Sequence, residues 1–196
     1  MSYYKHIDFS RVDDSDLIQF IENRQHVFTR TMLDLIVLNL RSALNQKGNQ
    51  QDVLPQVVVL LEKLQKEVEW LFQIQESKLF PFLRKLLEVY RRKQPLRFLK
   101  INLTESSLKQ VREEHANILS LLRNMRTLTN QFCPPANADE ITKLCYAELS
   151  EFCDDLTQQL YREDRFLLPR IAAMEAFVMR NSSREDAVAY GHGGDA

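Results

Sequence analysis

Long apolar stripes at helical spacing constrain this sequence more than any other feature. Apolar residues recur every three or four positions over long stretches, which is the spacing that places side chains on one face of an α-helix. The clearest stripe comprises Val57, Leu61, Leu64, Val68, Leu71, Leu79, Phe82 and Leu86. Only four glycines and six prolines occur in 196 residues, so the chain has few of the residues that end helices or form turns. These features predict an all-α protein.

Four long helical segments follow from the stripes and from the residues that begin and end helices. Asp13 or Asp14 is expected to cap the first helix, Thr104 the third, and Asn137 the fourth, in a capping box with Glu140. Pro81 is expected to kink or divide the second helix. The expected helices begin near residues 13, 52, 104 and 137, and end near Gly48, Arg92, Gln131 and Met179.

Segments of this length with short connections predict an up-down-up-down four-helix bundle over residues 13–180. Residues 1–12 are expected to form an irregular lead-in, and residues 181–196, which are polar and contain three glycines, a flexible tail.

Composition excludes several classes of protein. The net charge is −1 with both signs interspersed, so no basic face indicates nucleic-acid binding. No stretch is long and apolar enough for a signal peptide or a membrane span, which predicts a soluble, cytoplasmic protein. Three cysteines without a CxxC pair, Cys133, Cys145 and Cys153, are expected to be reduced thiols.

Each predicted helix carries a polar residue where its stripe calls for a core side chain. On the fourth helix the row Ile141, Cys145, Leu149, Phe152 and Leu156 continues into Gln159 and Glu163, one turn apart. The corresponding residues of the other helices are His26, Gln75 and His115. Burying an amide or a carboxylate without a partner costs several kcal/mol. These five side chains are therefore expected to meet inside one bundle.

An internal repeat links the second and fourth helices. Leu71 and Gln75 precede Phe80-Pro81 at the same spacing at which Gln159 and Glu163 precede Leu168-Pro169. This pattern resembles hemerythrin-like bundles, and more narrowly the di-iron proteins that repair iron–sulfur centres after nitrosative or oxidative damage. The resemblance spans roughly residues 17–171 and is carried by Glu114-His115, Leu128-Thr129-Asn130, Pro134-Pro135, Asp154-Asp155-Leu156 and Leu167-Leu168-Pro169-Arg170.

The resemblance implies a di-iron site of four histidines and two bridging glutamates, which this chain matches in part. His26, His115 and Glu163 stand at three of the six ligand positions and are the candidate metal ligands. The other three positions hold Leu71, Gln75 and Gln159. Leucine has no donor atom, and neutral amides bind iron less well than carboxylates or imidazoles. Iron is the cofactor that the resemblance implies, but a full di-iron centre is not expected.

Three functions remain open at this point. The residues favour a binding or regulatory protein that has lost its di-iron centre and acts through a protein partner or as a homodimer, with its five polar side chains in a hydrogen-bonded network. The alternative is a working repair-type metalloprotein with a reduced, single-iron site on His26, His115 and Glu163. A third, a bundle that holds haem or another organic ligand, has only general support. No nucleophile–base pair or phosphate-binding loop indicates an enzyme.

Overall fold

The computed structural model describes residues 8–47, 53–94 and 105–191, which form four long helical rods. The first rod comprises α1 (Asp14–Phe20), the π-helical turn η1 (Ile21–His26) and α2 (Val27–Lys47). The second comprises α3 (Leu54–Ile74), the π-helical turn η2 (Gln75–Leu79) and α4 (Phe80–Arg91). The third is α5 (Glu105–Leu128). The fourth comprises α6 (Glu140–Arg162), the π-helical turn η4 (Glu163–Leu167) and α7 (Leu168–Gly191).

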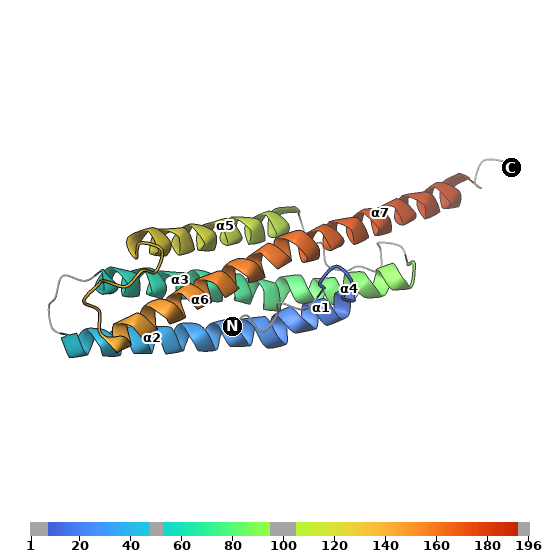
Figure 1. Ribbon diagram of the computed structural model, residues 1–196. Helices are drawn as coiled ribbons and strands as arrows, with labels where there is room; N and C mark the ends of the chain where they lie inside the picture. The colour runs from blue at the N-terminus through green and yellow to red at the C-terminus, as the bar shows by residue number, and fades with distance from the viewer. Residues whose placement is uncertain (1–7, 48–52, 95–104, 192–196) are drawn as a thin grey trace.

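The rods pack as an antiparallel four-helix bundle, which confirms the predicted fold (Figure 1). Helices α2, α3, α5 and α6 form its main body, in which α3 contacts both α2 and α5, and α6 contacts both α2 and α5. Beyond the start of α5 the bundle continues with three helices, where α4 packs against both α1 and α7. The described residues contain no strand, and none of their helices is both long and apolar enough to cross a bilayer.

The core follows the stripes seen in the sequence. Every member of the stripe on the second rod, from Val57 to Leu86, is at most 1% exposed. On the fourth rod the prediction was wrong at one end, because Ile141 is 45% exposed and Thr142 is buried in its place. The helix has only just begun at Glu140. The stripe therefore enters the core one turn later, at Cys145.

Pro81 and Pro169 are accommodated by π-helical turns. Proline has no N–H and its ring crowds the carbonyl four residues earlier. The turns η2 and η4 precede the prolines, and in them Phe80 N–H donates to Gln75 O and Leu168 N–H to Glu163 O, each five residues back. The second rod is therefore widened at Pro81 and continues helically from Ile74 to Arg91, where the sequence predicted a kink or a division.

Helix ends show which capping predictions hold. Asp13 caps α1 by accepting a hydrogen bond from Ser15 N at 2.9 Å, as expected. The predicted cap at Asn137 is wrong: Asp139 caps α6 and accepts from Thr142 N at 2.8 Å. Since Ala138 N bonds to Pro135 O in a turn, the helix cannot begin before Asp139.

The fourth rod is longer than predicted. Helix α7 continues to Gly191, whereas a flexible tail was expected from residue 181. Residues 181–190 contain neither glycine nor proline, and a helix that is already nucleated adds one hydrogen bond for each residue that joins it. The last five residues of the predicted tail, the predicted stop at Gly48, the start at Asp52 and the cap at Thr104 lie outside the described residues.

Arg170 ties the amino-terminal segment to the fourth rod. Residues 8–12 are not helical, and the buried ring of Phe9 lies 5.4 Å from that of Phe20. The Arg170 guanidinium donates to the carbonyl oxygens of Phe9, Ser10 and Val12 at 2.8 to 3.0 Å, and to Asp14 Oδ1 at 3.0 Å. The Arg170 side chain thus supplies hydrogen bonds to three backbone carbonyl groups that are not bonded within a helix.

We expect Arg170→Ala to detach the segment before α1. Hydrogen bonds from a charged donor are worth about 1.5 to 3 kcal/mol, so the free energy of unfolding should fall by about 2 kcal/mol. Amide hydrogen exchange of residues 8–14 should accelerate. Arg165→Ala, at an exposed residue one turn earlier, is the matched control. Equal losses in the two variants would contradict this role for Arg170.

Candidate functional site, a buried carboxylate between two amides

Glu163 stands at the centre of the polar cluster. Its side chain is fully buried at the start of η4. Gln75 Nε2, from η2, donates to Glu163 Oε2 at 2.5 Å, and Gln159 Nε2, one turn before Glu163, donates to Oε1 at 3.1 Å. Each carboxylate oxygen therefore receives one amide N–H, and the two amides come from rods that are not adjacent in sequence.

His115 supplies the positive charge beside this carboxylate. Its Nε2 lies 3.2 Å from Glu163 Oε2, at an angle that does not satisfy a hydrogen bond, so the contact is an ion pair. Its Nδ1 lies 2.9 Å from Asp164 Oδ1. Burial opposes the charge on the ring, but Asp164 and Glu163 outweigh it and raise the pKa of His115 to about 9. Burial likewise acts to raise the pKa of Glu163, yet its neighbours, His115 first, hold that pKa below the usual value.

Thr29, on α2, orients the Gln159 amide. The Thr29 hydroxyl donates to Gln159 Oε1 at 3.0 Å, which turns Nε2 toward Glu163. Both side chains are 3% exposed, and a buried amide whose two ends are both paired has one preferred orientation. The first rod therefore contributes to the cluster through a residue that its apolar stripe did not single out.

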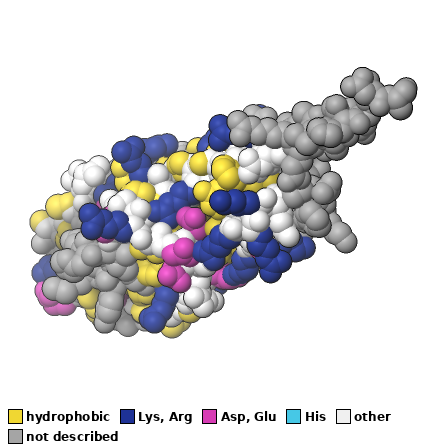
Figure 2. Space-filling model, turned by 90° about the vertical axis from the view of Figure 1, so that its right-hand side faces the viewer, with side chains coloured by type: hydrophobic (Ala, Val, Ile, Leu, Met, Phe, Trp, Pro, Cys, Tyr) yellow, Lys and Arg dark blue, Asp and Glu magenta, His cyan; other side chains and the backbone are white. Residues whose placement is uncertain are grey.

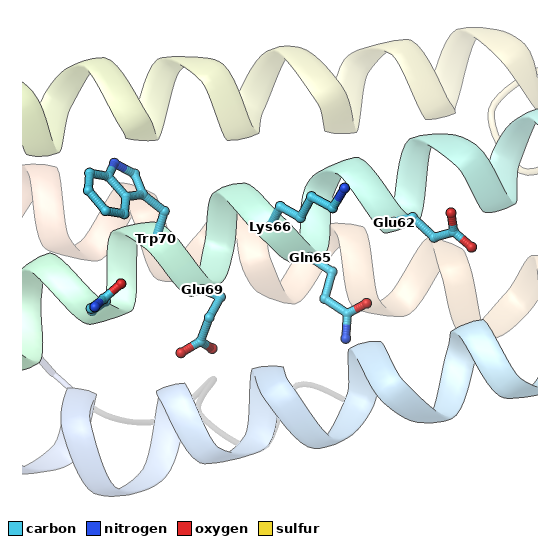
Figure 3. A pocket seen from close by; sticks show the side chains of 6 residues that line it. Glu62, Gln65, Lys66, Glu69 and Trp70 are labelled. Atoms are coloured by element: carbon cyan, nitrogen blue, oxygen red, sulfur yellow. The ribbon is translucent and has the colours of Figure 1, made fainter.

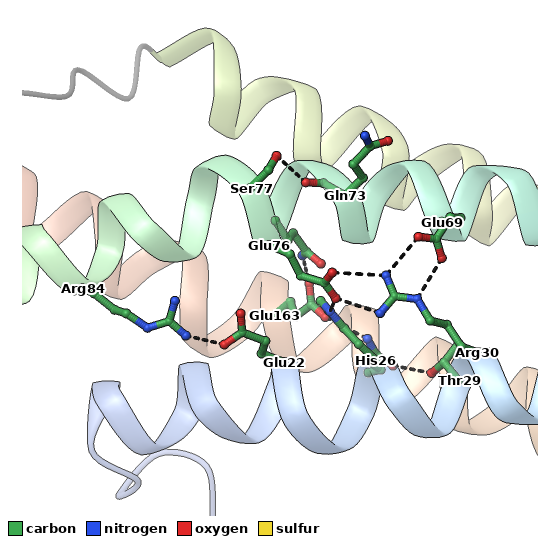
Figure 4. Close-up of polar contacts among 12 residues, drawn as sticks. Glu22, His26, Thr29, Arg30, Glu69, Gln73, Glu76, Ser77, Arg84 and Glu163 are labelled. Carbon is green, nitrogen blue, oxygen red and sulfur yellow. Dashed lines mark hydrogen bonds and ion pairs between the residues drawn. The ribbon is translucent and has the colours of Figure 1, made fainter.

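His26 belongs to a second group of polar side chains, whose other members, Glu76 and Arg30, are partly exposed to solvent (Figure 4). Its Nδ1 lies 2.7 Å from Glu76 Oε1, and its ring stacks on Phe72 with the centroids 3.7 Å apart. Arg30 pairs with both Glu76 and Glu69, the nearest contacts being 2.8 Å. Burial dominates at His26 and lowers its pKa. The side chain is fully buried, and its Nε2 has no hydrogen-bond partner among the described residues.

The two histidines are held in the same way. Glu76 follows Gln75, and Asp164 follows Glu163. Each of these two carboxylates binds the Nδ1 of the histidine on the preceding rod. Gln75 and Glu163 are 88 positions apart and both open a five-residue π-helical turn. The internal repeat seen in the sequence is therefore also a repeat of hydrogen bonds.

The structure brings most of the predicted site residues together. His115, Glu163, Gln75 and Gln159 are in contact. His26 bonds to Glu76 instead and interacts with Glu163 only through the charges of the two groups. Leu71 is buried in the apolar core, one turn before Gln75. Sequence reasoning missed four further residues: Thr29, Arg30, Glu76 and Asp164. A signal was present for two of these, because both carboxylates follow a polar residue of the stripe.

The donor set does not fit the two irons that the resemblance implies. Both oxygens of Glu163 face amide N–H groups, which repel a cation instead of sharing it. Leu71 offers no donor atom at a third ligand position. In the part of the chain that the structure describes, no three His, Cys, Asp or Glu side chains are grouped in a way that could hold a metal ion.

The cavities near the cluster are small. One bordered by Gln25, Thr29 and Gln159 has about 10 Å³ of space, enough for roughly one water molecule. A groove of about 530 Å³ lies on the outer face of α3 and is lined by Glu62, Gln65, Lys66, Glu69, Trp70 and Gln73 (Figure 3). The groove is open to solvent, and one of its lining residues, Glu69, pairs with Arg30. Figure 2 shows none of the described histidines on the face it presents, as their burial requires.

The fold and the site define a four-helix bundle built from two similar helix pairs around a buried polar cluster. No family model matches the sequence. Over 164 residues the chain is 26% identical to a probable iron-sulfur cluster repair protein of Haemophilus influenzae, and the match covers 84% of this chain and 68% of that protein. Over 63 residues it is 35% identical to the iron-sulfur cluster repair protein YtfE of Musicola paradisiaca, covering 32% of this chain and 28% of that protein. The curated relatives are iron–sulfur cluster repair proteins, which confirms the resemblance predicted from the sequence.

We expect the stability of the bundle to fall at alkaline pH through His115. Its pKa rises from 6.5 to about 9 on folding, so its contribution is complete below pH 6.5 and is lost as the pH rises through about 9. One proton changes the free energy of unfolding by at most about 1.4 kcal/mol per pH unit. Urea denaturation between pH 6 and pH 10 measures the slope.

His115→Gln is the matched variant for this measurement. It removes the charge at His115, so the alkaline slope assigned to that residue should disappear. An unchanged slope in the variant would assign the loss of stability to another group.

Proposed function

We propose that this chain is a binding or regulatory relative of the iron–sulfur cluster repair proteins, without a di-iron centre and without catalytic activity of its own. The observation that carries the proposal is the pair of amide hydrogen bonds to Glu163. A carboxylate whose two oxygens already accept from Gln75 and Gln159 is satisfied without a cation. Its role, in nitrosative or oxidative stress or in iron handling, is then exerted through contact with another protein.

The charges of the cluster support a metal-free core. Glu163 is held ionised beside His115, whose raised pKa keeps it protonated at neutral pH, so one negative charge meets one positive charge. The amides are neutral, and Leu71 completes the packing. A buried ion pair is tolerated when most of its remaining lone pairs and protons are hydrogen-bonded. Here Gln75, Gln159 and Asp164 make three such bonds, while His115 Nε2 and Gln75 Oε1 have no hydrogen-bond partner among the described residues.

One observation favours the alternative, a repair-type metalloprotein with a single metal ion. His26 Nε2 is buried without a described partner, while Glu76 fixes its Nδ1. Metal-binding histidines are commonly oriented by a carboxylate at the other ring nitrogen. Asp164 holds the Nδ1 of His115 in the same way as Glu76 holds that of His26. We place this function second because no three His, Cys, Asp or Glu side chains among the described residues are grouped in a way that could hold a metal ion.

Metal content distinguishes the two functions. The protein, purified without oxygen, is incubated with excess ferrous iron, desalted and analysed by mass spectrometry for iron and manganese. We expect well under about 0.2 ions per chain, equal to the value for a His115→Ala, Glu163→Ala double variant. About one ion per chain in the native protein, lost in the double variant, would refute the proposal and establish the metalloprotein.

A further inference from the structure

The outer face of α2 carries a second apolar row. This outer row has the three- and four-residue spacing of one helix face and consists of Phe28, Thr31, Leu35, Leu38, Ser42 and Asn45. None of its members is charged, and its three apolar side chains are 36% to 65% exposed. The core side of the same helix is formed by Leu33, Ile36 and Leu40. A surface helix usually has charged and polar residues opposite its core side, so α2 presents apolar surface where solvent would favour charges.

The start of α6 extends this apolar surface. Ile141 and Leu144 are 45% and 58% exposed and lie on one face of α6 with Glu148. Asn39, which follows Leu38 on α2, donates from Nδ2 to Glu148 Oε2 at 3.0 Å. This edge of α6 therefore lies beside the outer row. Helices α2 and α6 pack side by side (Figure 1), so their exposed apolar side chains border one surface.

Acidic side chains border this surface on both sides. On the α3 side Gln65 Nε2 donates to Asp34 Oδ1 at 2.7 Å, and on the α6 side Asn39 holds Glu148. Both partners are neutral amides, and among the described residues no lysine or arginine forms an ion pair with either carboxylate. Arg41, on the same side of α2 as Asp34, is already paired with a glutamate of α3. The borders of the surface therefore carry negative charge that the chain does not balance.

A second copy of this chain fits the surface poorly. In a symmetric dimer the same patch of both copies meets itself. Asp34 borders the outer row toward α3, and Glu148 borders it toward α6. Whether the two α2 helices run parallel or antiparallel, carboxylates of one copy then face carboxylates of the other, and like charges in contact oppose binding. The charges favour a basic partner instead.

We propose that the outer row of α2 and the start of α6 form the docking surface for a basic amphipathic helix of a partner protein. The apolar face of that helix packs on Leu35, Leu38 and Leu144, and its flanking lysines or arginines meet Asp34 and Glu148. Helices that bind in this way place apolar residues at i, i+3, i+4 and i+7. The outer row from residue 28 to 42 is about 21 Å long, enough for about four turns of such a helix. This inference rests on the proposed function, in which the chain acts through contact with another protein.

Binding of a synthetic peptide tests the inference. The probe is a fluorescein-labelled helical peptide of about three heptads, with leucine at the a and d positions and lysine at the flanking e and g positions. A second peptide has glutamate in place of each lysine. We expect the lysine peptide to bind the native protein with a Kd of about 1 to 100 μM, and the glutamate peptide to bind at least about tenfold more weakly. Fluorescence anisotropy measures both, and added salt should weaken the binding of the lysine peptide.

Two double variants and one control locate the binding on the protein. Leu35→Ser, Leu38→Ser removes apolar contact area and should weaken binding of the lysine peptide about tenfold or more. Asp34→Asn, Glu148→Gln removes two charges, so it should weaken binding and also reduce its dependence on salt. The matched control is Val59→Ser on α3, because Val59 and Leu38 are both 65% exposed, and it should bind as the native protein does. Circular dichroism checks that each variant is helical.

Three results would overturn the inference. The lysine peptide could fail to bind the native protein, or it could bind the Leu35→Ser, Leu38→Ser variant and the Val59→Ser control equally well. Sedimentation could also show a native dimer that the Leu35→Ser, Leu38→Ser variant converts to a monomer, which would assign the surface to a second copy. Each of these results leaves the proposed function intact, because metal content tests that function separately. Stoichiometric metal in the native protein would refute the proposed function whatever the peptide does.

Discussion

The burial of one carboxylate determines the rest of the polar core. Moving an ionised carboxyl group from water into a protein interior costs several kcal/mol even after relaxation. Glu163 is fully buried, so every one of its lone pairs needs a partner. Gln75, Gln159 and His115 supply these partners from the other rods and from the preceding turn. Thr29 and Asp164 are required in turn, because they orient Gln159 and His115.

The π-helical turns place these side chains at one level of the bundle. A π-helical turn adds a residue to the helical circuit and changes which face the following side chains occupy. In the second and fourth rods it begins at the polar residue and ends before the proline, so one irregularity serves two needs. The wider turn accommodates the proline ring, and it places Gln75 and Glu163 at corresponding points of their rods. The first rod has a similar turn, which ends at His26.

The sequence predicted the fold well because the fold depends on helical periodicity and on the scarcity of helix breakers. It also predicted that five buried polar side chains meet, since a buried polar residue in an apolar stripe requires a partner. Four of them, His115, Glu163, Gln75 and Gln159, are in contact, whereas His26 bonds to Glu76. The supporting residues were not predictable in the same way. Glu76 and Asp164 are partly exposed, and an exposed carboxylate on a helix usually has no specific role. Thr29 is a small residue whose contact with Gln159 depends on the register of two rods that are 130 residues apart in sequence.

Two complete sets of side chains would suit the interior around Glu163: amides without a metal, or charged and basic ligands with one. A mixture of the two sets suits neither case. A glutamate at position 75 without a metal would place a second negative charge against Glu163, whose Oε2 now accepts from the Gln75 amide at 2.5 Å. A histidine at position 159 would remove the N–H that Oε1 accepts and the acceptor that Thr29 uses. Conversely, an amide in a metal core supplies neither the charge nor the basicity that iron requires. We therefore expect intermediate combinations to be less stable than either complete set. This coupling accounts physically for the joint presence of Gln75 and Gln159, on two different rods, around Glu163.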